Sequence, residues 1–397
     1  MRNMRLLFVT SFYPPITGGG SSRIYDLSRS LASMGLEVRV LTFSSISNLF
    51  RKEGSKEVEV LRVPALGLKH PLDQILTGFI GVLLVSRARD FVITSVPMGE
   101  PCIGAFFACS FLGKRMVVDV RDEWEDAVIG RTRHLLTKTL YNLYRKLFNT
   151  IYQKSTFVTT VTPTLMKRME QRGVSRMYLI PNGADLRMFH PLTEDGQIET
   201  RKEIGLKADD FMIVYAGRIG WYYRIDTVIK ALDILVNKQK LASIKFLAMG
   251  AGESVEEYLK LSKSLALDEN VIFLGERRRE EVAKILPCCD LGVIPFDDDP
   301  IWLSAYTTKI FEYCASGLPV IVSVVSGSDL QKLVKKNNIG FTTTPMRPVE
   351  MAEAILEAYK NKAQLKIMRA NARNLAIRDF DRKKIAEKLA NILKTHQ

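Results

Sequence analysis

The sequence is poor in the residues that form disulfides and metal sites. Its 397 residues include five cysteines and four histidines. The cysteines are odd in number, lie in apolar surroundings and show no CxxC spacing, which argues against disulfides and zinc and favours a reducing cytoplasm. The histidines are scattered without the spacing of metal ligands. These residues are Cys102, Cys109, Cys288, Cys289 and Cys314, with His70, His134, His190 and His396.

Long hydrophobic runs are also missing. The longest, ILTGFIGVLLV (75–85) and CIGAFFACSFLG (102–113), are well short of the roughly 20 residues that a spanning helix needs. The opening MRNMRLLFVT has an apolar run too short for a signal peptide and leads directly into a glycine loop. We therefore expect a cytoplasmic protein in which no segment spans a membrane.

Low-complexity tracts are absent, and the composition is that of a globular protein. Apolar residues make up 47% and charged residues 25% of the chain, enough to bury large sheets. A chain of 397 residues exceeds one ordinary core, so two large domains are expected. The net charge of +14 favours anionic partners, namely nucleic acid, anionic lipid or phosphorylated metabolites.

Short apolar runs alternate with helix-length patterns along the chain. RLLFVT, EVRVLTF and RMVVDV in the first half, and FMIVYAG, IKFLAMG and LGVIPF in the second, read as strands followed by helices. This alternation predicts parallel sheets covered on both faces, and it occurs twice. We expect an N-terminal domain over residues 1–190, a linker over 191–205, a C-terminal domain over 206–377 and a helix over 378–397 that can pack back on the first domain.

A glycine-rich loop follows the first strand. In parallel α/β sheets ligands lie beyond the carboxyl ends of the strands, so the loops after the strands are the candidate site. Gly18, Gly19 and Gly20 precede a helix whose N-terminal amides favour an anion, and the missing side chains permit close approach. A phosphate is the expected ligand, and the alternative is that the glycines serve only the turn.

Cationic and acidic side chains follow strands of the second domain. Arg218 comes just after YAG and Arg224 slightly later, and a guanidinium suits bidentate phosphate binding. After LGVIPF a helix begins near Tyr306, Thr307 and Thr308, with Glu312 about one turn inside. A buried carboxylate there can accept hydrogen bonds from the vicinal hydroxyls of a ribose. The alternatives are solvated arginines, a surface lysine at Lys309 and a helix-face carboxylate.

Charged residues also crowd behind the strand RMVVDV. Asp119, Arg121, Asp122, Glu123 and Glu125 follow one another there. Such a cluster suits acid/base or hydroxyl-binding work, although a helix N-terminus also favours acids. We favour Arg121 with Asp122 as the functional pair.

Seven segments together resemble one enzyme family. FYPPITGGGSSR, VVDVRDEW, IPNGAD, AGRIG, MGAGE, NVIFLGE and TTKIFEYCASGLPVI occur in the order and spacing of glycosyltransferase family 4, and the likeness covers nearly the whole chain. The resemblance implies a GT-B fold, in which two Rossmann-like, doubly wound parallel-sheet domains face a cleft. It also implies that a sugar passes, with retention and without a required metal, from a nucleotide-diphosphate sugar to a hydroxyl acceptor.

The resemblance also implies roles for individual residues. The C-terminal domain would hold most of the donor: Arg218, with Arg224 or Lys309, would bind the diphosphate and Glu312 the ribose. The candidate catalytic residues are Asp122, Arg121 and Arg218. The donor set is Gly19, Gly20, Arg218, Arg224, Gly275, Glu276, Ser304, Thr307, Thr308, Lys309 and Glu312, in which the backbone around Gly275 and Glu276 would bind the base and the two N-terminal glycines would approach the diphosphate as the cleft closes.

The chain departs from the family pattern at several positions. Many members carry a glutamate where this chain has Ser304, a lysine where it has Trp221 to Tyr223, and a histidine where it has Arg121. The forms RDxW and TK-x-F-E-Y resemble transferases that add amino or deoxy sugars in polysaccharide or lipid-linked oligosaccharide assembly. DDD at 297–299 is expected to line the donor-sugar site, with metal binding as the lesser alternative.

Residues 131–154 predict a basic amphipathic helix. The segment has six Lys or Arg and no acid, with Leu136, Leu140, Leu143, Leu147 and Ile151 at helical spacing. It can lie on an anionic membrane surface, as a lipid-linked acceptor would require, or its leucines can belong to the core.

Three functions are consistent with these observations. The first is a nucleotide-sugar glycosyltransferase of hexosyl or N-acetylhexosaminyl type, cytoplasmic or peripheral on the inner face of the cell membrane. The second is a non-catalytic nucleotide-sugar binder on the same fold. The third, a nucleic-acid binder, rests on charge alone because the sequence has no recognised reader motif.

Overall fold

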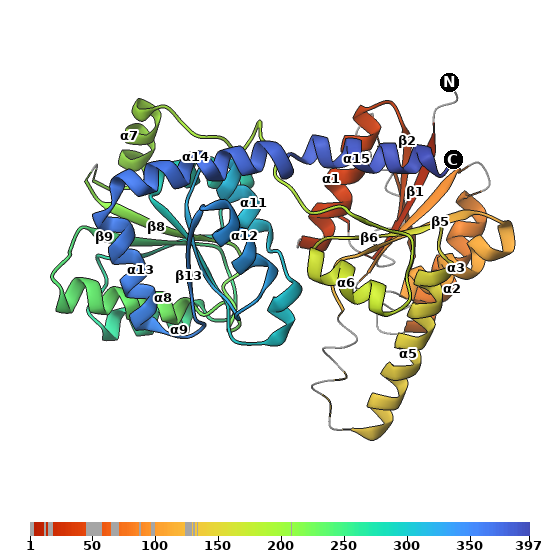
Figure 1. The fold of residues 1–397 in the computed structure, drawn as a ribbon, viewed down its shortest axis with the longest axis horizontal. Coiled ribbons are helices and arrows are strands. Elements are labelled where there is room, and N and C mark those ends of the chain that lie inside the picture. Colours follow the sequence, from red (N-terminus) through yellow and green to blue (C-terminus); the bar gives the residue numbers. More distant parts are fainter. Residues whose placement is uncertain are drawn as a thin grey trace. The chain divides into compact units, whose positions relative to one another are not determined.

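The chain forms two compact units. The computed structural model describes residues 4–11, 13–14, 19–44, 58–64, 71–86, 89–96, 100–123, 129, 132, 134–207 and 209–397. Unit 1 comprises Met1–Asn182 with Arg382–Gln397, and unit 2 comprises Gly183–Asp381. Each described unit has a parallel sheet with helices on both faces (Figure 1), so the predicted pair of Rossmann-like domains is confirmed.

Unit 1 is built on a sheet whose seven described strands run in the order β3-β2-β1-β4-β5-β6-β7, all paired in parallel. The central strands are buried apolar runs, as expected for a sheet covered on both faces. The strands are β1 (Arg5–Thr10), β2 (Glu37–Ser44), β3 (Val58–Pro64), β4 (Phe91–Val96), β5 (Arg115–Val120), β6 (Phe157–Thr160) and β7 (Met177–Leu179).

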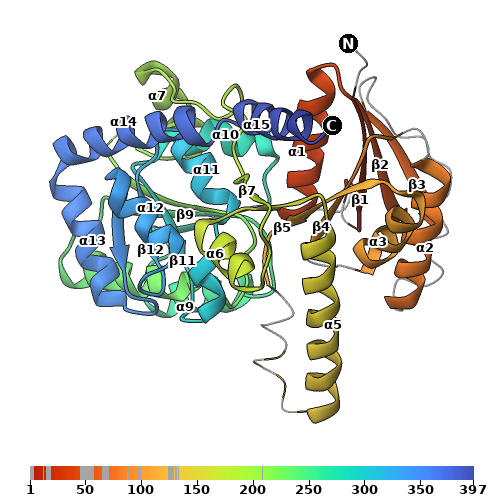
Figure 2. The same ribbon diagram turned by 45° about the vertical axis from the view of Figure 1, so that its right-hand side comes forward.

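The helices of unit 1 divide between the two faces of this sheet. Helices α1 and α15 pack on one face through residues such as Leu27 and Leu389. Helices α2, α3, α5 and α6 pack on the other through residues such as Val82, Ala105 and Ile151 (Figure 2). Their bounds are α1 (Gly19–Ser33), α2 (Pro71–Val85), α3 (Glu100–Leu112), α5 (Leu135–Lys154), α6 (Pro163–Gln171) and α15 (Arg382–Thr395).

Unit 2 has a sheet of six described strands in the order β10-β9-β8-β11-β12-β13, again all parallel. Two apolar clusters, one on each face, bury the sheet completely at its centre. The strands are β8 (Phe211–Ala216), β9 (Ile244–Met249), β10 (Val271–Gly275), β11 (Leu291–Pro295), β12 (Val320–Ser323) and β13 (Gly340–Thr343).

The helices of unit 2 also cover both faces. Helices α10, α11, α12 and α14 pack on one side, and α8, α9 and α13 pack on the other. The bounds are α7 (Glu194–Glu203), α8 (Ile225–Leu232), α9 (Val255–Ser264), α10 (Arg279–Ile285), α11 (Thr308–Ala315), α12 (Asp329–Asn337), α13 (Pro348–Lys360) and α14 (Lys362–Asp379), with a π-helical turn η2 (Asp233–Lys238) and 3₁₀ turns η3 (Leu286–Cys288) and η4 (Pro300–Ser304).

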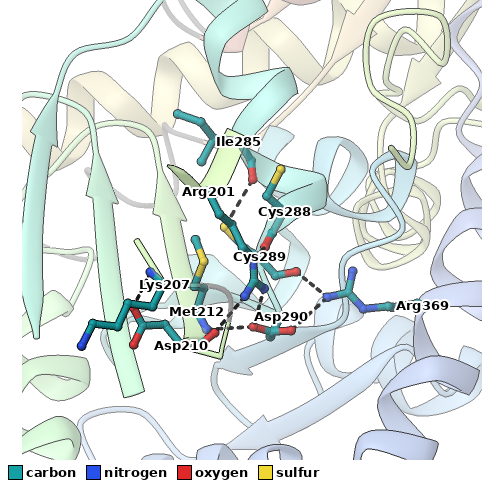
Figure 3. A network of polar contacts seen from close by, with 9 residues as sticks. All are labelled: Arg201, Lys207, Asp210, Met212, Ile285, Cys288, Cys289, Asp290 and Arg369. Atoms are coloured by element: carbon teal, nitrogen blue, oxygen red, sulfur yellow. Dashed lines mark hydrogen bonds and ion pairs between the residues drawn. The ribbon is translucent and has the colours of Figure 1, made fainter. Parts of the chain in front are cut away.

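The segment predicted as a linker, 191–205, contains helix α7 and is part of unit 2. Thr193 caps the helix, and a polar network holds it to the amino-terminal edge of the sheet (Figure 3). Arg201 donates to the Asp290 carboxylate at 3.0 Å and to the carbonyl oxygen of Cys288, and Arg369 bonds the same carboxylate. Two guanidiniums on one carboxylate therefore place α7 and α14 against the start of β11.

The boundary between the units in the structure lies at Asn182, and the chain returns to unit 1 at Arg382. The predicted boundary was residue 190, and the predicted terminal helix began at residue 378. Helix α15 packs beside α1, and Arg382 pairs with Asp26 at 2.7 Å. Among the described residues, no helix is long and apolar enough to cross a membrane.

Candidate functional site

The predicted site residues of unit 2 follow the carboxyl ends of its strands. Arg218 follows β8, Glu276 follows β10, and Lys309 follows β11 at the start of α11. A hollow of about 660 Å³ lies at the opposite, amino-terminal edge, and its walls carry both charge signs, including Arg201, Lys362 and Asp290. Because ligands of parallel α/β sheets bind beyond the carboxyl ends, we place the candidate site at the carboxyl edge.

Glycines bring the loops after β8 and β9 into backbone contact. Gly217 has φ +136°, and a Cβ on it would lie 2.9 Å from the Lys309 Nζ atom. Gly250 has φ +147°, and a Cβ there would lie 1.8 Å from the carbonyl oxygen of Gly217. Any other residue at Gly250 would force the two loops apart, and one at Gly217 would meet the Lys309 side chain in a backbone conformation that favours glycine.

Lys309 is a buried cation directly below the first of these loops. Only 5% of the residue is exposed, which removes the surface-lysine alternative. Its Nζ atom lies 4.0 Å from the ring centre of Tyr223 and 4.8 Å from that of Tyr215. Burial lowers the pKa of Lys309 to about 7, against the opposing charge of Glu312. Aromatic rings therefore surround this ammonium. No carboxylate of the described residues lies within ion-pair distance of it.

The first turn of α11 lies beside this lysine. Thr307 occupies the N-cap position, but its side chain does not cap the helix within the described structure; it bonds the Tyr223 hydroxyl instead. The helix starts at Thr308, within the predicted range 306–308. A helix start whose amides are not capped by a side chain favours an anion, since their partial charges are positive.

Glu312 lies one turn further along α11 and is paired. Its Oε1 atom accepts a hydrogen bond from Arg279 Nη2 at 2.9 Å, with 18% of the Glu312 side chain exposed. The Arg279 guanidinium also lies over the Phe189 ring, 5.5 Å from its centre. The carboxylate is thus held in one orientation, with part of it open to solvent.

The two predicted arginines both have carboxylate partners. Arg218 pairs with Glu253 at 3.0 Å, and its side chain is 65% exposed. Arg224 bonds both oxygens of Asp226 at 2.9 Å, and Asp226 also pairs with Lys230. Arg218 is therefore the more accessible of the two, while Arg224 is held at the start of α8.

Gly275 ends β10 with φ +71°, and the exposed Glu276 follows it. The carbonyl oxygen of Gly275 accepts a hydrogen bond from Gly250 N at 2.8 Å. The predicted base-binding backbone thus joins the same glycine-linked edge as Gly217.

An aromatic cluster lies next to Lys309. The rings of Phe296 and Trp302 stack with centres 3.9 Å apart, Tyr222 stacks on Trp302, and Tyr223 stacks on Phe296. Tyr223 belongs to both this cluster and the lysine contact. We call Tyr222, Tyr223, Phe296 and Trp302 the aromatic wall.

The acidic run and Ser304 shape the loop after β11, which carries Phe296 and Trp302 of the aromatic wall. Asp297 accepts a hydrogen bond from the Trp302 indole, and Asp299 accepts one from Ile301 N at 2.9 Å, which begins the turn η4. Ser304 ends this turn and is buried. Two of the three aspartates thus have local partners.

In unit 1, a buried ion pair joins the amino-terminal part of α1 to the carboxyl ends of β5 and β7. Arg23 of α1 bonds both oxygens of Asp119 at 2.7 and 2.8 Å. It also donates to the carbonyl oxygens of Ile180 and Pro181 and to Asn182. Burial acts to raise the pKa of Asp119, but the Arg23 charge and hydrogen bonds outweigh it and hold the pKa below its usual value.

The predicted pair Arg121 and Asp122 directly follows β5, and both residues are partly buried. Burial lowers the pKa of Arg121, whereas the charges of Asp119 and Asp122 oppose that effect. Glu123, by contrast, is buried against Arg168 and Arg172, each at 2.8 Å. Glu123 is therefore a structural carboxylate, whereas Arg121 and Asp122 lie partly exposed at the edge of the sheet.

Several predicted residues are placed only in part. Gly19 and Gly20 begin α1, so the loop does lead into a helix. Gly18, Trp124 and Glu125 lie outside the described residues. The role of the two described glycines in phosphate approach stays a prediction.

Three residues of these sites, Arg23, Arg279 and Trp302, are not among the predicted ones, and only Arg23 had a signal in the sequence. Arg23 shares the i, i+4, i+8 stripe of Leu27 and Leu31, and a charge on a buried stripe indicates an internal ion pair. Arg279 and Trp302 carried no comparable signal, because their partners Glu312 and Tyr222 are far away along the chain.

Both halves of the chain match glycosyltransferase families. Residues 17–187 match Glycosyltransferase Family 4, and residues 196–375 match Glycosyl transferases group 1. An uncharacterized glycosyltransferase of Methanocaldococcus jannaschii is 24% identical, with 98% of each chain covered.

Two further proteins are similar over different extents. An Escherichia coli UDP-Gal:alpha-D-GlcNAc-diphosphoundecaprenol alpha-1,3-galactosyltransferase is 26% identical, over 55% of this chain and 54% of the relative. The crystal structure of Anabaena HepE in complex with UDP and glucose superposes with a TM-score of 0.76 at 18% identity, covering 99% of this chain and 100% of HepE.

Proposed function

The chain belongs to glycosyltransferase family 4, and from that premise we propose that it transfers a sugar, with retention at the anomeric carbon, from a nucleotide-diphosphate sugar to a glycan or lipid-linked precursor. The transferase class rests on both halves of the chain. The donor chemistry, the stereochemistry and the acceptor are the proposed part.

The observation that carries the proposal is the buried ammonium of Lys309. This ammonium lies between aromatic rings, below a glycine loop and beside a helix start. No carboxylate among the described residues pairs with it to neutralise its charge. A diphosphate has the charge and the oxygen atoms for such a position. We assign Lys309 and the first-turn amides of Thr308 and its neighbours to the diphosphate.

Arg218 has the complementary role of stabilising the leaving group. Its exposed guanidinium can leave Glu253 for a phosphate oxygen at little cost, because exposed ion pairs are weak. Negative charge grows on the diphosphate as the glycosidic bond breaks, so a mobile cation there lowers the barrier. Arg224 is assigned a positioning role, since its Nε and Nη2 atoms already donate to both oxygens of Asp226.

Glu312 and Gly275 are assigned to the nucleoside. The partly exposed Glu312 carboxylate, oriented by Arg279, accepts hydrogen bonds from the ribose hydroxyls. The backbone around Gly275 and Glu276 contacts the base. Both assignments follow the family pattern.

The aromatic wall is assigned to the donor sugar. It lies next to Lys309, and Ser304 replaces the glutamate that many members have on this loop. An apolar wall favours a sugar that presents C–H groups, a methyl or an acetyl group there. We therefore propose an amino or deoxy sugar of hexosyl or N-acetylhexosaminyl type.

Unit 1 is assigned to the acceptor. Arg121 and Asp122 follow the central strand β5 and are suited to bind or polarise an acceptor hydroxyl. The E. coli relative named above acts on a diphosphoundecaprenol-linked sugar, which supports a lipid-linked precursor. Buried, unpaired thiols at all five cysteines support a reducing, cytoplasmic location at the inner face of the membrane.

We propose that the reaction needs no bound metal. The cations Lys309 and Arg218 supply positive charge at the diphosphate, and Asp297 and Asp299 already accept hydrogen bonds within their own loop. Addition of a chelator to a working assay should leave the turnover unchanged.

Two linked measurements test the function. A panel of nucleotide sugars is screened by thermal stabilisation, and the best donor is then assayed for nucleoside diphosphate release with lipid-linked acceptors. We expect stabilisation and release by the same donor, with an α-linked product from an α-linked donor. Stabilisation without release by any acceptor would contradict the transfer assignment, and inversion of the anomeric centre would contradict retention.

A further inference from the structure

Three helices on one face of unit 1 expose large apolar side chains. Among the described residues, sixteen large apolar side chains are more than a third exposed, and ten of them lie on α2, α3 and α5. The other six are scattered over unit 2. Exposed apolar residues that occur singly are ordinary, but a cluster on neighbouring helices indicates a binding surface.

Helix α2 presents a continuous row. Leu72, Leu76, Ile80 and Leu84 follow one another at i+4 spacing, and their exposed fractions are 74, 54, 45 and 76%. Residues four apart share one helix face, so these side chains form a stripe that points away from the buried Val82.

The neighbouring helix α3 adds two aromatic residues, and the helix pair is tightly packed. Phe107 and Phe111 are 50 and 79% exposed. Inside the pair, a Cβ on Gly104 would lie 2.0 Å from the carbonyl oxygen of Ile75, so the two backbones touch. The exposed residues are therefore presented by a rigid pair and do not result from loose packing.

Helix α5, which α3 also contacts, splits the predicted leucine stripe in two. Ile151 is fully buried in the core, whereas Leu136, Leu140 and Leu143 are 87, 64 and 59% exposed. The interpretation as core is correct for the C-terminal half of the helix only. Its N-terminal half projects apolar side chains to solvent.

The charged side chains of α5 are all positive. The helix carries Lys138, Arg145, Lys146 and Lys154 and no acidic residue. The acids of the other two helices, Asp73 and Glu100, lie in first turns, where the helix dipole favours them. An apolar face flanked by cations is complementary to a bilayer whose lipid headgroups are anionic.

We propose that the exposed apolar rows of α2, α3 and α5 dock on an anionic bilayer surface. The leucine and phenylalanine side chains enter the headgroup boundary, and the α5 lysines contact lipid phosphates. The inference supports the membrane-linked acceptor of the proposed function, but it concerns binding alone, so it can fail while the transferase assignment stands.

Vesicle co-sedimentation of the full chain tests the proposal. We expect the wild type to bind mixed phosphatidylcholine–phosphatidylglycerol vesicles much more strongly than pure phosphatidylcholine vesicles, with a loss at high salt because charge is screened. Lys138→Gln with Lys146→Gln should weaken binding to mixed vesicles by roughly fivefold per cation. The exposed pair Lys335→Gln with Lys336→Gln on α12 is the matched control and should bind as the wild type does.

Apolar variants test the second component of docking. Leu140→Asn with Leu143→Asn should lower the partition constant about tenfold or more. Val349→Asn with Ile367→Asn, at 59 and 57% exposure in unit 2, is the matched control and should change little. Folding is checked by circular dichroism and by unchanged thermal stabilisation with a nucleoside diphosphate.

Three outcomes would overturn the docking proposal. Equal binding to both vesicle types removes the anionic partner. Equal loss in the test and control variants removes the rows of α2, α3 and α5 as the docking site. Dissociation of a dimer by Leu140→Asn with Leu143→Asn, without any effect on vesicle binding, would show that the face joins two copies of the chain.

Discussion

Two buried cations at carboxyl edges, one in each unit, have opposite surroundings. Arg23 in unit 1 bonds both oxygens of Asp119 and three further acceptors. Lys309 in unit 2 is held by the rings of Tyr215 and Tyr223, without a carboxylate in bonding distance among the described residues. The side chain of Arg23 is 2% exposed, and the whole of Lys309 is 5% exposed.

The difference separates structural charge from functional charge. A buried ion pair with complete hydrogen bonding fixes the elements that it joins, and removal of one partner leaves the other charged and buried. A buried cation without its anion costs stability in the free protein, and that cost falls when an anionic ligand arrives. Arg23 should therefore act on folding, and Lys309 on ligand binding.

The largest expected effect is on the stability of unit 1. Arg23→Met leaves the Asp119 carboxylate buried without its partner and should lower the free energy of unfolding by about 3–5 kcal/mol. Urea unfolding followed by circular dichroism measures this. Asp119→Leu added to Arg23→Met should recover part of the loss, because both charges are then absent. Wild-type stability in the single variant would show that the pair does not stabilise unit 1.

Lys309→Met should have the opposite profile. We expect no loss of stability at neutral pH, and a loss of nucleoside diphosphate affinity of about 1.5–3 kcal/mol, the usual worth of hydrogen bonds to charged groups. Isothermal calorimetry and thermal unfolding measure the two quantities. If the variant unfolds more easily and binds normally, Lys309 is a structural residue like Arg23.

The difference in stability between the wild type and the Lys309→Met variant should also depend on pH in a defined direction. The pKa of Lys309 is about 7 in the folded chain and the ordinary 10.5 in the unfolded chain. Between these values the unfolded chain binds the extra proton, so this residue's contribution to stability rises with pH. The variant should be more stable than the wild type below pH 7, with the advantage fading toward pH 10. A constant difference would contradict the buried-ammonium interpretation.

The same titration predicts how donor binding responds to pH. The free enzyme loses the Lys309 proton above about pH 7, but the diphosphate needs the charged form. Wild-type affinity should therefore fall as the pH rises from 7 to 9, by at most about tenfold per pH unit. Lys309→Met is the control, because any titration of the ligand's own phosphate persists in it. Parallel pH profiles for the two proteins would exclude Lys309 as the titrating group.

Much of the fold could be predicted from the sequence, because buried parallel strands are apolar runs. The edge strands β3 and β13 were not expected, since VEVLRVP carries charges and GFTT is short and polar. An edge strand is paired on one side only and can be partly exposed, so its hydrophobic signal is weaker.

The candidate site was predictable where a motif and a strand end coincide, as at Arg218 and Lys309. The burial of Lys309 could have been inferred from its neighbours, because it shares a helix face with the buried Tyr313. The pairs Arg279–Glu312 and Tyr222–Trp302 could not, since each joins two segments that lie far apart in the sequence. The same holds for α5, whose stripe is half core and half surface because only its C-terminal half packs in the core of unit 1.

The smallest expected effect tests whether the aromatic rings, and not hydroxyl groups, hold Lys309 in place. Tyr223→Phe keeps the ring below the ammonium and loses only the bond to Thr307, so donor affinity should stay close to that of the wild type. Tyr223→Leu removes the ring face, and with it a cation–π contact worth about 0.5–2 kcal/mol.

The charged form of Lys309 is less favoured in Tyr223→Leu, so donor affinity at pH 7 should fall and its decline with rising pH should begin at a lower pH. Calorimetric titrations of both variants across pH provide the measurement. Equal losses of donor affinity in the two variants would mean that the bond between Tyr223 and Thr307 positions the helix start. Lys309 would then depend on hydrogen bonds, as Arg23 does, and not on aromatic rings.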